Sequence, residues 1–356
     1  MKKVLKTILW ILLILVAAVL IYILYAVCSY QRLEDHLPLP VSGTAQEQLE
    51  AGEPVRLLSY NLGFGAYSDD FSFFMDGGKE SWARSPEAVR ENLGGALEVV
   101  LEQDPDLVGF QEIDLDGTRS HHIDEREIVK AQLPGYASVF AQNYDSPYML
   151  WPLNQPHGAN QAGMMTFSRY PITSAVRRSL PIEKGLMKMM DLDRCYSVSR
   201  IPVDNGRELV LYGLHLAAYT SDGTIAEQQL EMLLQDMQKE LDQGNYTVAA
   251  GDFNKDLLGD SGALFGVTGE EAGWAQPIPP EMIPEHFRLE APFSEETPVA
   301  SCRNADRPYG PDSFRVTVDG FLLSDNVRTV DCSVIDTGFR WSDHNPVRLD
   351  LILEAA

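Results

Sequence analysis

Cysteine is scarce in this sequence of 356 residues. Its four cysteines, Cys28, Cys195, Cys302 and Cys332, are too few for a disulfide scaffold. Cys302 and Cys332 could pair in an oxidising compartment, and buried free thiols explain the same residues at least as well. No cysteine stands in the polar clusters described below, so the sequence does not support catalysis by a cysteine nucleophile.

Positive charge is also in short supply. Lys and Arg number 28 against 52 Asp and Glu, which gives a formal charge of −24 at pH 7. Proteins that hold nucleic acid through its phosphates normally present a basic surface. Duplex DNA is therefore a disfavoured substrate, although bound divalent cations would offset part of the negative charge locally.

Charge is absent altogether from one stretch near the amino terminus. Ile8 to Val27 is an unbroken run of 20 apolar or aromatic residues, long enough to cross a bilayer as a helix. A cleaved signal peptide is the main alternative, but its apolar region is usually only about 7–15 residues and ends at small residues. We therefore predict a retained anchor over residues 1–30, with lipid attachment at Cys28 as a third and weaker alternative.

The charges that flank this run predict its orientation. Lys2, Lys3 and Lys6 precede it, and Glu34 and Asp35 follow it. Positive charge stays on the cytoplasmic side of a membrane helix. The sequence thus predicts a single-pass protein of the plasma membrane whose remaining part is extracytoplasmic.

Beyond the anchor, residues 31–54 contain scattered Pro and Gly and are predicted to form a stalk or linker. Residues 55–353 alternate strand-like and helix-like segments, with residues 259–311 forming an insertion or long loop because they show no clear period. Helices are expected over 86–103, 124–133 and 222–241, and strands over 55–60, 107–111, 136–142, 163–168, 195–203, 208–214, 246–250, 315–323, 328–335 and 346–353. This order predicts an α/β (α+β) fold, a four-layer sandwich of two packed mixed sheets flanked by helices.

Polar residues with catalytic potential stand at the ends of the apolar strands. The set is Asn61, Glu112, His215, Asp252, Asn254, Asp319, Asp343 and His344. Any one of them could be a simple turn residue, because Asn and Asp are common turn formers. Carboxylates, amides and imidazoles held together at strand ends suit metal-assisted hydrolysis of a phosphoester.

The order of these residues resembles the endonuclease/exonuclease/phosphatase superfamily, whose fold is that of deoxyribonuclease I. The resemblance covers residues 55–353, and a membrane-anchored bacterial-type member would fit the first segment. It rests on Ser59-Tyr60-Asn61, Phe110-Gln111-Glu112, Ser168-Arg169-Tyr170-Pro171-Ile172, Leu214-His215-Leu216, Gly251-Asp252-Phe253-Asn254, Val318-Asp319-Gly320-Phe321 and Ser342-Asp343-His344-Asn345-Pro346-Val347.

The resemblance implies a role for each residue. Glu112, Asn61 and Asp343 would hold Mg²⁺, with Mn²⁺ as an alternative. Asp252 would activate water, and His344 paired with Asp319 would stabilise the transition state or supply a proton. Asn254 and His215 would bind the phosphate. A positively charged side chain would also stabilise it, and the candidates are Arg194, Lys188 and Lys184.

Together these features predict a membrane-anchored, extracytoplasmic, metal-dependent phosphodiesterase or phosphatase that uses an activated water. The expected substrate is a phosphoester, with a phospholipid or its head group favoured by the anchor. A nuclease that acts on extracellular nucleic acid is the alternative within this class. A binding module that retains the fold without catalysis is the alternative from another class.

Overall fold

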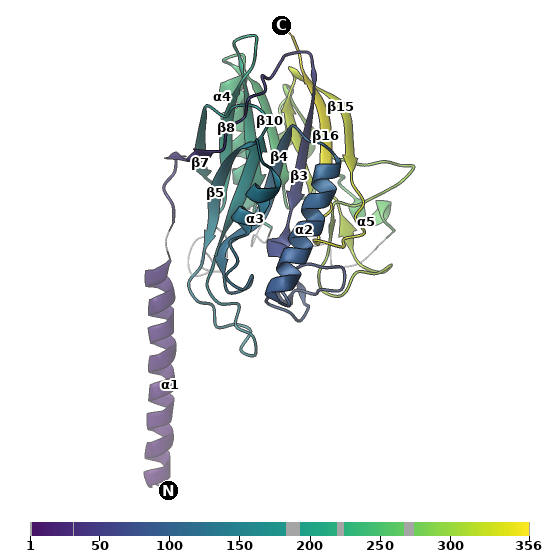
Figure 1. Ribbon diagram of the computed structural model, residues 1–356. Coiled ribbons are helices and arrows are strands. Elements are labelled where there is room, and N and C mark those ends of the chain that lie inside the picture. The colour runs from purple at the N-terminus through teal and green to yellow at the C-terminus, as the bar shows by residue number, and fades with distance from the viewer. Residues whose placement is uncertain (1, 31, 183–192, 219–223, 267–273, 356) are drawn as a thin grey trace.

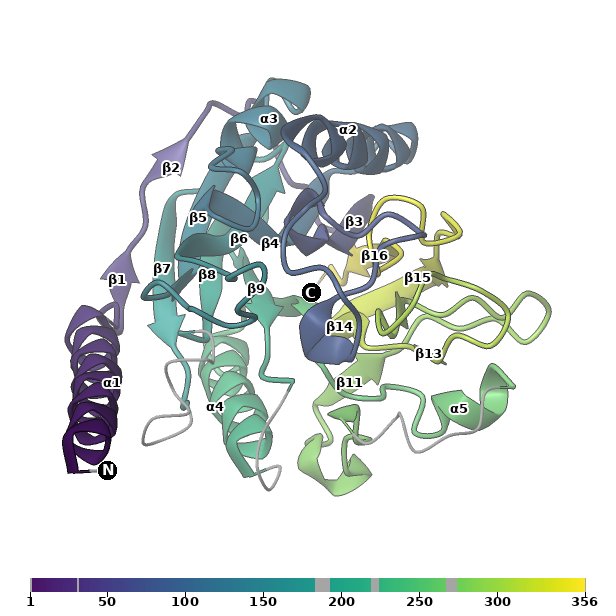
Figure 2. The same ribbon diagram turned by 90° about the horizontal axis from the view of Figure 1, so that it is seen from below.

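The computed structural model describes residues 2–30, 32–182, 193–218, 224–266 and 274–355. Two seven-stranded sheets pack face to face, and helices cover their outer faces (Figures 1 and 2). Leu57, Val248, Phe321 and Leu349 come from both sheets and are completely buried in one shared core. The expected four-layer sandwich is confirmed.

Each large sheet contains one parallel pair of strands, so both sheets are mixed. The first sheet runs in the order β1 (Leu37–Pro38), β7 (Ser174–Ser179), β8 (Cys195–Pro202), β9 (Glu208–His215), β10 (Tyr246–Asp252), β14 (Asp319–Ser324) and β11 (Phe287–Glu290). The second runs β15 (Val327–Val334), β16 (Val347–Leu353), β3 (Pro54–Asn61), β4 (Leu107–Gly117), β6 (Asn160–Ser168), β5 (Ala137–Asp145) and β2 (Val41–Ser42). The parallel pairs are β9 with β10 and β3 with β4.

The outer helices follow from their apolar periodicity. α2 (Pro86–Glu102) begins at Ser85, whose side chain accepts a hydrogen bond from the Ala88 amide, and has Pro86 in its first turn. Its buried face carries Val89, Leu93, Ala96, Leu97 and Val100, which repeat at helical spacing. α2 and α3 (Glu125–Gln132) cover the second sheet, and α4 (Thr224–Leu241) covers the first.

α1 (Lys2–Ser29) extends away from the sandwich (Figure 1). Its most apolar window has a mean hydropathy of 3.0, and 6% of that window is buried. Among the described residues it is the one helix long and apolar enough to cross a membrane. The carboxyl terminus lies at the opposite edge of the sandwich (Figure 1).

The segment expected to be a stalk lies against the domain. Leu37–Pro38 pairs with β7 at the edge of the first sheet, and Val41–Ser42 pairs with β5 at the edge of the second. Leu49 is buried in the core between the sheets. The segment predicted as a stalk or linker is thus packed on the domain over part of its length, because alternate apolar residues reach sheet edges that would otherwise be unpaired.

Three other segments differ from the sequence prediction. The strand expected over 315–323 is two strands: β13 (Arg315–Val316) pairs with β12 (Cys302–Arg303) in a small separate sheet, and β14 joins the first sheet. The expected loop at 259–311 contributes β11, β12 and the short α5 (Ser261–Leu264). β7 was not predicted, since its sequence Ser-Ala-Val-Arg-Arg-Ser lacks an apolar run.

Two neighbouring glycines on α2 provide a test of this packing. A Cβ atom built on Gly95 would lie 2.4 Å from the indole of Trp341, whereas one on Gly94 meets nothing within 4 Å. We expect Gly95→Ala to destabilise the protein by about 1–3 kcal/mol through overpacking. Gly94→Ala should stabilise it by up to about 1 kcal/mol, because alanine favours the helix.

Thermal unfolding monitored by tryptophan fluorescence measures both changes. A Gly95→Ala protein as stable as the Gly94→Ala protein would contradict the contact between α2 and Trp341.

Candidate active site

The carboxyl ends of both parallel strand pairs meet at one edge of the sandwich. In the first sheet, the pairing register places His215 beside Asp252, and Asp252 beside Asp319. In the second sheet, Asn61 lies opposite Gln111, the residue before Glu112. Asn61 Nδ2 donates to Asp252 Oδ2 across the two sheets at 3.2 Å. These residues of the site are thus held at the ends of rigid strands.

Glu112 reaches the site because β4 is irregular at this point. The pairing of β4 with β6 shifts register between Phe110 and Ile113, which marks a bulge. Glu112 has a φ of 54°, in the left-handed region that glutamate rarely adopts. Its Oε1 accepts a hydrogen bond from Asn61 Nδ2 at 3.3 Å. The strained backbone directs this carboxylate into the cleft.

His344 and Asp319 form a buried pair. Nδ1 of His344 lies 2.7 Å from Asp319 Oδ2. The other ring nitrogen, Nε2, faces Asp252 Oδ2 at 3.9 Å. Asp319 is completely buried behind the histidine. A carboxylate behind an imidazole fixes its tautomer and leaves Nε2 to act toward the cleft.

The turn after β10 holds Asn254. Its φ is 50°, and its main-chain N–H donates to Asp252 Oδ1 at 2.8 Å. One hydrogen of its Nδ2 is donated to the Leu216 carbonyl at 2.8 Å. Asn254 is therefore a turn residue that also lines the pocket.

Different surroundings give the two histidines different protonation states. Burial, Arg194 and His344 together lower the pKa of His215 well below its usual value, so His215 is neutral. Burial also opposes a charge on His344, but the Asp319 carboxylate outweighs it and raises the pKa of His344 well above the usual range. One imidazole can therefore donate as a cation while the other stays neutral.

Burial also affects Asp252. Together with the nearby Asp319 charge it raises the pKa of Asp252 to about 7, against the opposing effect of His344. A carboxylate with a raised pKa is a stronger base than an exposed one, so Asp252 is suited to accept a proton.

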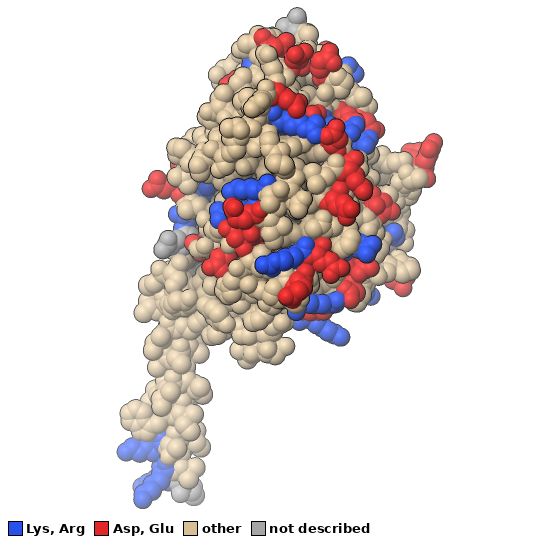
Figure 3. Space-filling view, viewed as in Figure 1, with Lys and Arg blue, Asp and Glu red and all other residues tan. Residues whose placement is uncertain are grey.

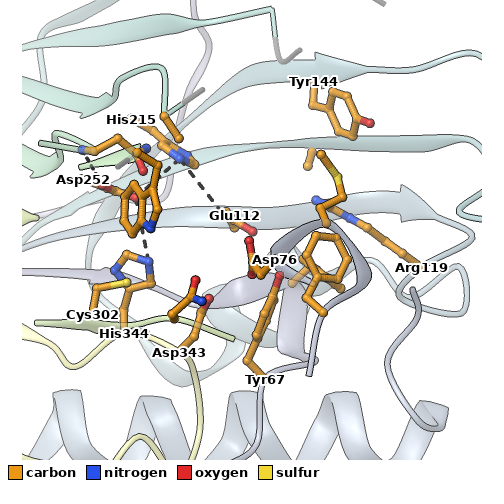
Figure 4. Close-up of a pocket in the computed structure, with 18 of the residues that line it drawn as sticks. Tyr67, Asp76, Glu112, Arg119, Tyr144, His215, Asp252, Cys302, Asp343 and His344 are labelled. Atoms are coloured by element: carbon orange, nitrogen blue, oxygen red, sulfur yellow. Dashed lines mark hydrogen bonds and ion pairs between the residues drawn. The ribbon is translucent and has the colours of Figure 1, made fainter. Parts of the chain in front are cut away.

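A single pocket brings most of the predicted residues together. Glu112, His215, Asp252, Asp343 and His344 line it (Figure 4). Asn254 and Arg194 line it as well. Asn61 and Asp319 lie just behind its wall, where they contact Asp252 and His344. Lys184 and Lys188 fall outside the described residues.

The sequence as a whole matches a known family. A sequence model described as the Endonuclease/Exonuclease/phosphatase family matches residues 58–344, a range that contains every predicted site residue. The chain belongs to this family. Members of the family hydrolyse phosphoester bonds, and the pocket holds the residue types that this chemistry needs. A comparison with curated protein sequences finds no match.

Solved structures share the fold. A family protein from Beutenbergia cavernae has a TM-score of 0.56 at 20% identity, covering 85% of this chain and 72% of that one. A second, from Bacteroides vulgatus, has a TM-score of 0.54 at 16% identity, covering 85% and 100%. ANGEL2, a 2′,3′-cyclic phosphatase solved with adenosine-2′,3′-vanadate, has a TM-score of 0.56 at 16% identity, covering 88% and 100%. At these identities the likeness concerns the fold alone.

Several pocket residues were missed at the level of sequence. Arg119 is buried, pairs with Asp114 at 2.8 Å and lies 4.0 Å above the Phe64 ring. The pocket is further lined by Tyr67, Phe73, Asp76, Asn143, Tyr144, His157 and Arg303. Arg119 follows the end of β4, which continues beyond the bulge. The predicted strand ended at residue 111, before the bulge, so the prediction did not bring Arg119 near the site. A cluster of aromatic residues over 64–74 was the available signal for this side of the pocket.

Two carboxylates of the pocket, Glu112 and Asp343, meet the requirements of Mg²⁺. Burial raises the pKa of Asp343 to about 6, and the Glu112 charge adds to this, so a cation between the two carboxylates would relieve their repulsion. Few carboxylates with additional waters are what Mg²⁺ prefers. Asn61 presents its amide nitrogen to Glu112 and Asp252, while its oxygen accepts from Gly63 N–H. In this arrangement Asn61 orients Glu112, and Glu112 and Asp343 fit the ion.

A second acidic group is less suited to a cation. Asp252, Asp319 and His344 offer ligand atoms within 4.8 Å of one another. However, the facing atoms of Asp319 and His344 already bind each other at 2.7 Å. This group is therefore better suited to proton handling.

Metal titration tests the assignment of Glu112. We expect the full chain in detergent to bind Mg²⁺ in calorimetry, and Glu112→Gln to lose that heat because a neutral amide is a poor ligand. Asp116→Asn is a matched control, since Asp116 lies on the same strand but its side chain is 63% exposed.

Equal Mg²⁺ binding by wild type and Glu112→Gln would contradict the assignment. No binding by wild type would instead favour a non-catalytic module.

Proposed function

We propose that this protein is a membrane-anchored, extracytoplasmic, metal-dependent phosphoester hydrolase that attacks its substrate with an activated water. Family membership supports the class of reaction. The observation that carries the proposal is the row His215, Asp252 and Asp319, with His344 held against Asp319 and facing Asp252. This row combines a base, a neutral imidazole and a charged imidazole around one point.

Each residue of the row has a distinct part in the reaction. Asp252 accepts a proton from the attacking water, because its raised pKa makes it a competent base. His344, protonated and oriented by Asp319, donates from Nε2 to the phosphoryl group as negative charge develops. Neutral His215 and the second amide hydrogen of Asn254 bind phosphoryl oxygens. His215, Asp252 and Asn254 stand at the end of the first sheet, and His344 comes from the segment before β16 of the second sheet.

The second sheet would supply the metal ligands. Glu112 and Asp343 would hold Mg²⁺, or Mn²⁺ as an alternative, and Asn61 would orient Glu112. When bound, the ion neutralises charge on the phosphoryl oxygens and so lowers the barrier to attack. Glu112 has a side chain 25% exposed, which lets it contact a ligand in the cleft.

α1 supports placement at the plasma membrane. It is followed within a few residues by β1, so the catalytic domain would lie close to the bilayer. Lys2, Lys3 and Lys6 at its start favour an amino terminus in the cytoplasm and a domain outside. Removing these three lysines from −24 leaves −27 on the remainder, since residues 1–30 contain no Asp or Glu. This charge disfavours a nuclease that acts on long duplexes.

Replacement of the buried pair tests the mechanism. We expect His344→Ala and Asp319→Asn each to lower kcat for a nitrophenyl phosphodiester, by about 10²–10⁴-fold for the histidine, because the proton donor is lost. His286 and Asp325 are a matched control pair: they form the same contact at 2.8 Å but are 61% and 53% exposed. His286→Ala and Asp325→Asn should retain wild-type rates, and a His344→Ala enzyme as active as these controls would refute the assignment.

A substrate panel separates the possible substrates. It contains sphingomyelin, phosphatidylinositol phosphates, single- and double-stranded DNA and a nitrophenyl phosphodiester, each with Mg²⁺ and with chelator. Turnover that persists in chelator would contradict metal dependence. Preference for DNA would select the nuclease alternative.

A further inference from the structure

An uncharged, apolar loop projects from the domain between β5 and β6. Residues 146–156 contain no Asp, Glu, Lys, Arg or His, in a chain with a formal charge of −24. Trp151 is 63% exposed, Leu153 77% and Leu150 44%. Exposed apolar side chains in such a cluster usually mark a site of interaction with a protein or a membrane.

The loop lies against the last turns of α1. The Tyr22 hydroxyl donates to the Tyr148 carbonyl at 3.1 Å, and the Tyr148 N–H donates to the Tyr25 hydroxyl at 3.1 Å. The Leu150 N–H donates to the Tyr22 hydroxyl at 3.3 Å. An apolar groove between the two is lined by Ile23 and Ala26 of α1 and by the loop. Figure 3 shows uncharged surface continuing from α1 onto the lower edge of the domain.

The position of these contacts along α1 gives the depth of the loop. Tyr22 stands five residues before Val27, the end of the apolar run. At 1.5 Å per residue, the contact lies about 7.5 Å inside the end of that run. Segments that bind at a membrane interface bury their apolar side chains to about 5–10 Å. Tyr and Trp are also the residues enriched near the membrane–water interface.

The catalytic pocket opens near the same surface. The carboxyl terminus follows β16 and lies beside the start of β3. α1 extends from the opposite end of the domain (Figure 1). The site, which lies at the far end of β3, is therefore on the side toward which α1 extends. Met75 and Tyr144 line both the apolar groove and the catalytic pocket. The rim of the pocket is thus continuous with the loop and the helix.

We propose that the 146–156 loop inserts into the outer leaflet of the bilayer that holds α1 and so turns the catalytic pocket toward the lipid head groups. The substrate is then the phosphoester of a bilayer lipid. This inference rests on the proposed function for its chemistry and on the loop for its location. Anchor and loop together give two points of attachment, which fix the orientation of the domain on the membrane.

Depth measurement tests the insertion without any enzymatic readout. The full chain, with Cys28→Ser to remove an exposed thiol, is reconstituted into phosphatidylcholine vesicles. An environment-sensitive fluorophore is attached at Leu153→Cys, or at Val330→Cys as a control that is 53% exposed on the far-edge strand β15. We expect a blue shift and quenching by brominated lipid for Leu153→Cys and neither for Val330→Cys. A Leu153→Cys probe that reports water would overturn the insertion.

A second experiment tests the substrate. Trp151→Ser combined with Leu153→Ser should lower hydrolysis of sphingomyelin or phosphatidylinositol phosphate in the vesicles about tenfold, since apolar contact with the bilayer is lost. Hydrolysis of a soluble nitrophenyl phosphodiester should stay unchanged, as should both activities in Val330→Ser. Equal rates on lipid for variant and wild type would overturn the inference.

The soluble nitrophenyl phosphodiester also distinguishes the proposed hydrolase activity from the proposed lipid substrate. Its hydrolysis by wild type without hydrolysis of any lipid would leave the phosphoester hydrolase standing and overturn the lipid substrate. Failure on both, with a Leu153→Cys probe in the bilayer, would overturn the catalytic proposal and leave the membrane contact standing.

Discussion

The site depends on the two parallel strand pairs, one in each sheet, that end at the same edge of the sandwich. Parallel neighbours bring their carboxyl ends together, and face-to-face packing brings the two pairs together. The hydrogen bond from Asn61 to Asp252 crosses the interface between the sheets. The distances in the site that join residues of different sheets therefore depend on the core between the sheets, and a change in that core would alter them without any change in the site residues.

The parts of the fold that could be predicted from sequence are those with strong local signals. β10 and β16 carry dense apolar residues, and α2 has both a capping serine and a regular apolar face. Edge elements were missed or misjudged, since their pairing depends on the neighbouring strand rather than on their own composition. β1 and β2 are of this kind, and β7 lies next to the edge, where its outer neighbour is the two-residue β1.

In the candidate site, too, some residues could be predicted from the sequence and others could not. Motif order located Asp252, Asp319 and His344, because strand ends and their turns are visible in the sequence. Arg119 was not identified as a pocket residue: it is placed by a bulge in β4 and by a buried partner, Asp114, neither of which has a local signature. The protonation states of the two histidines could not be predicted from the sequence either. The pKa values of His215 and His344 shift in opposite directions because different groups surround each ring.

The left-handed backbone at Glu112 has a consequence for how the sequence can vary. A non-glycine residue in this conformation costs on the order of 1–2 kcal/mol, and Glu112 and Asn254 both adopt it within one pocket. Selection for folding alone would favour glycine at position 112, whereas asparagine at position 254 already tolerates the conformation well. Glutamate at position 112 is thus unfavourable for stability. In a homologue that had lost the activity, we expect position 112 to be among the first to change to another residue.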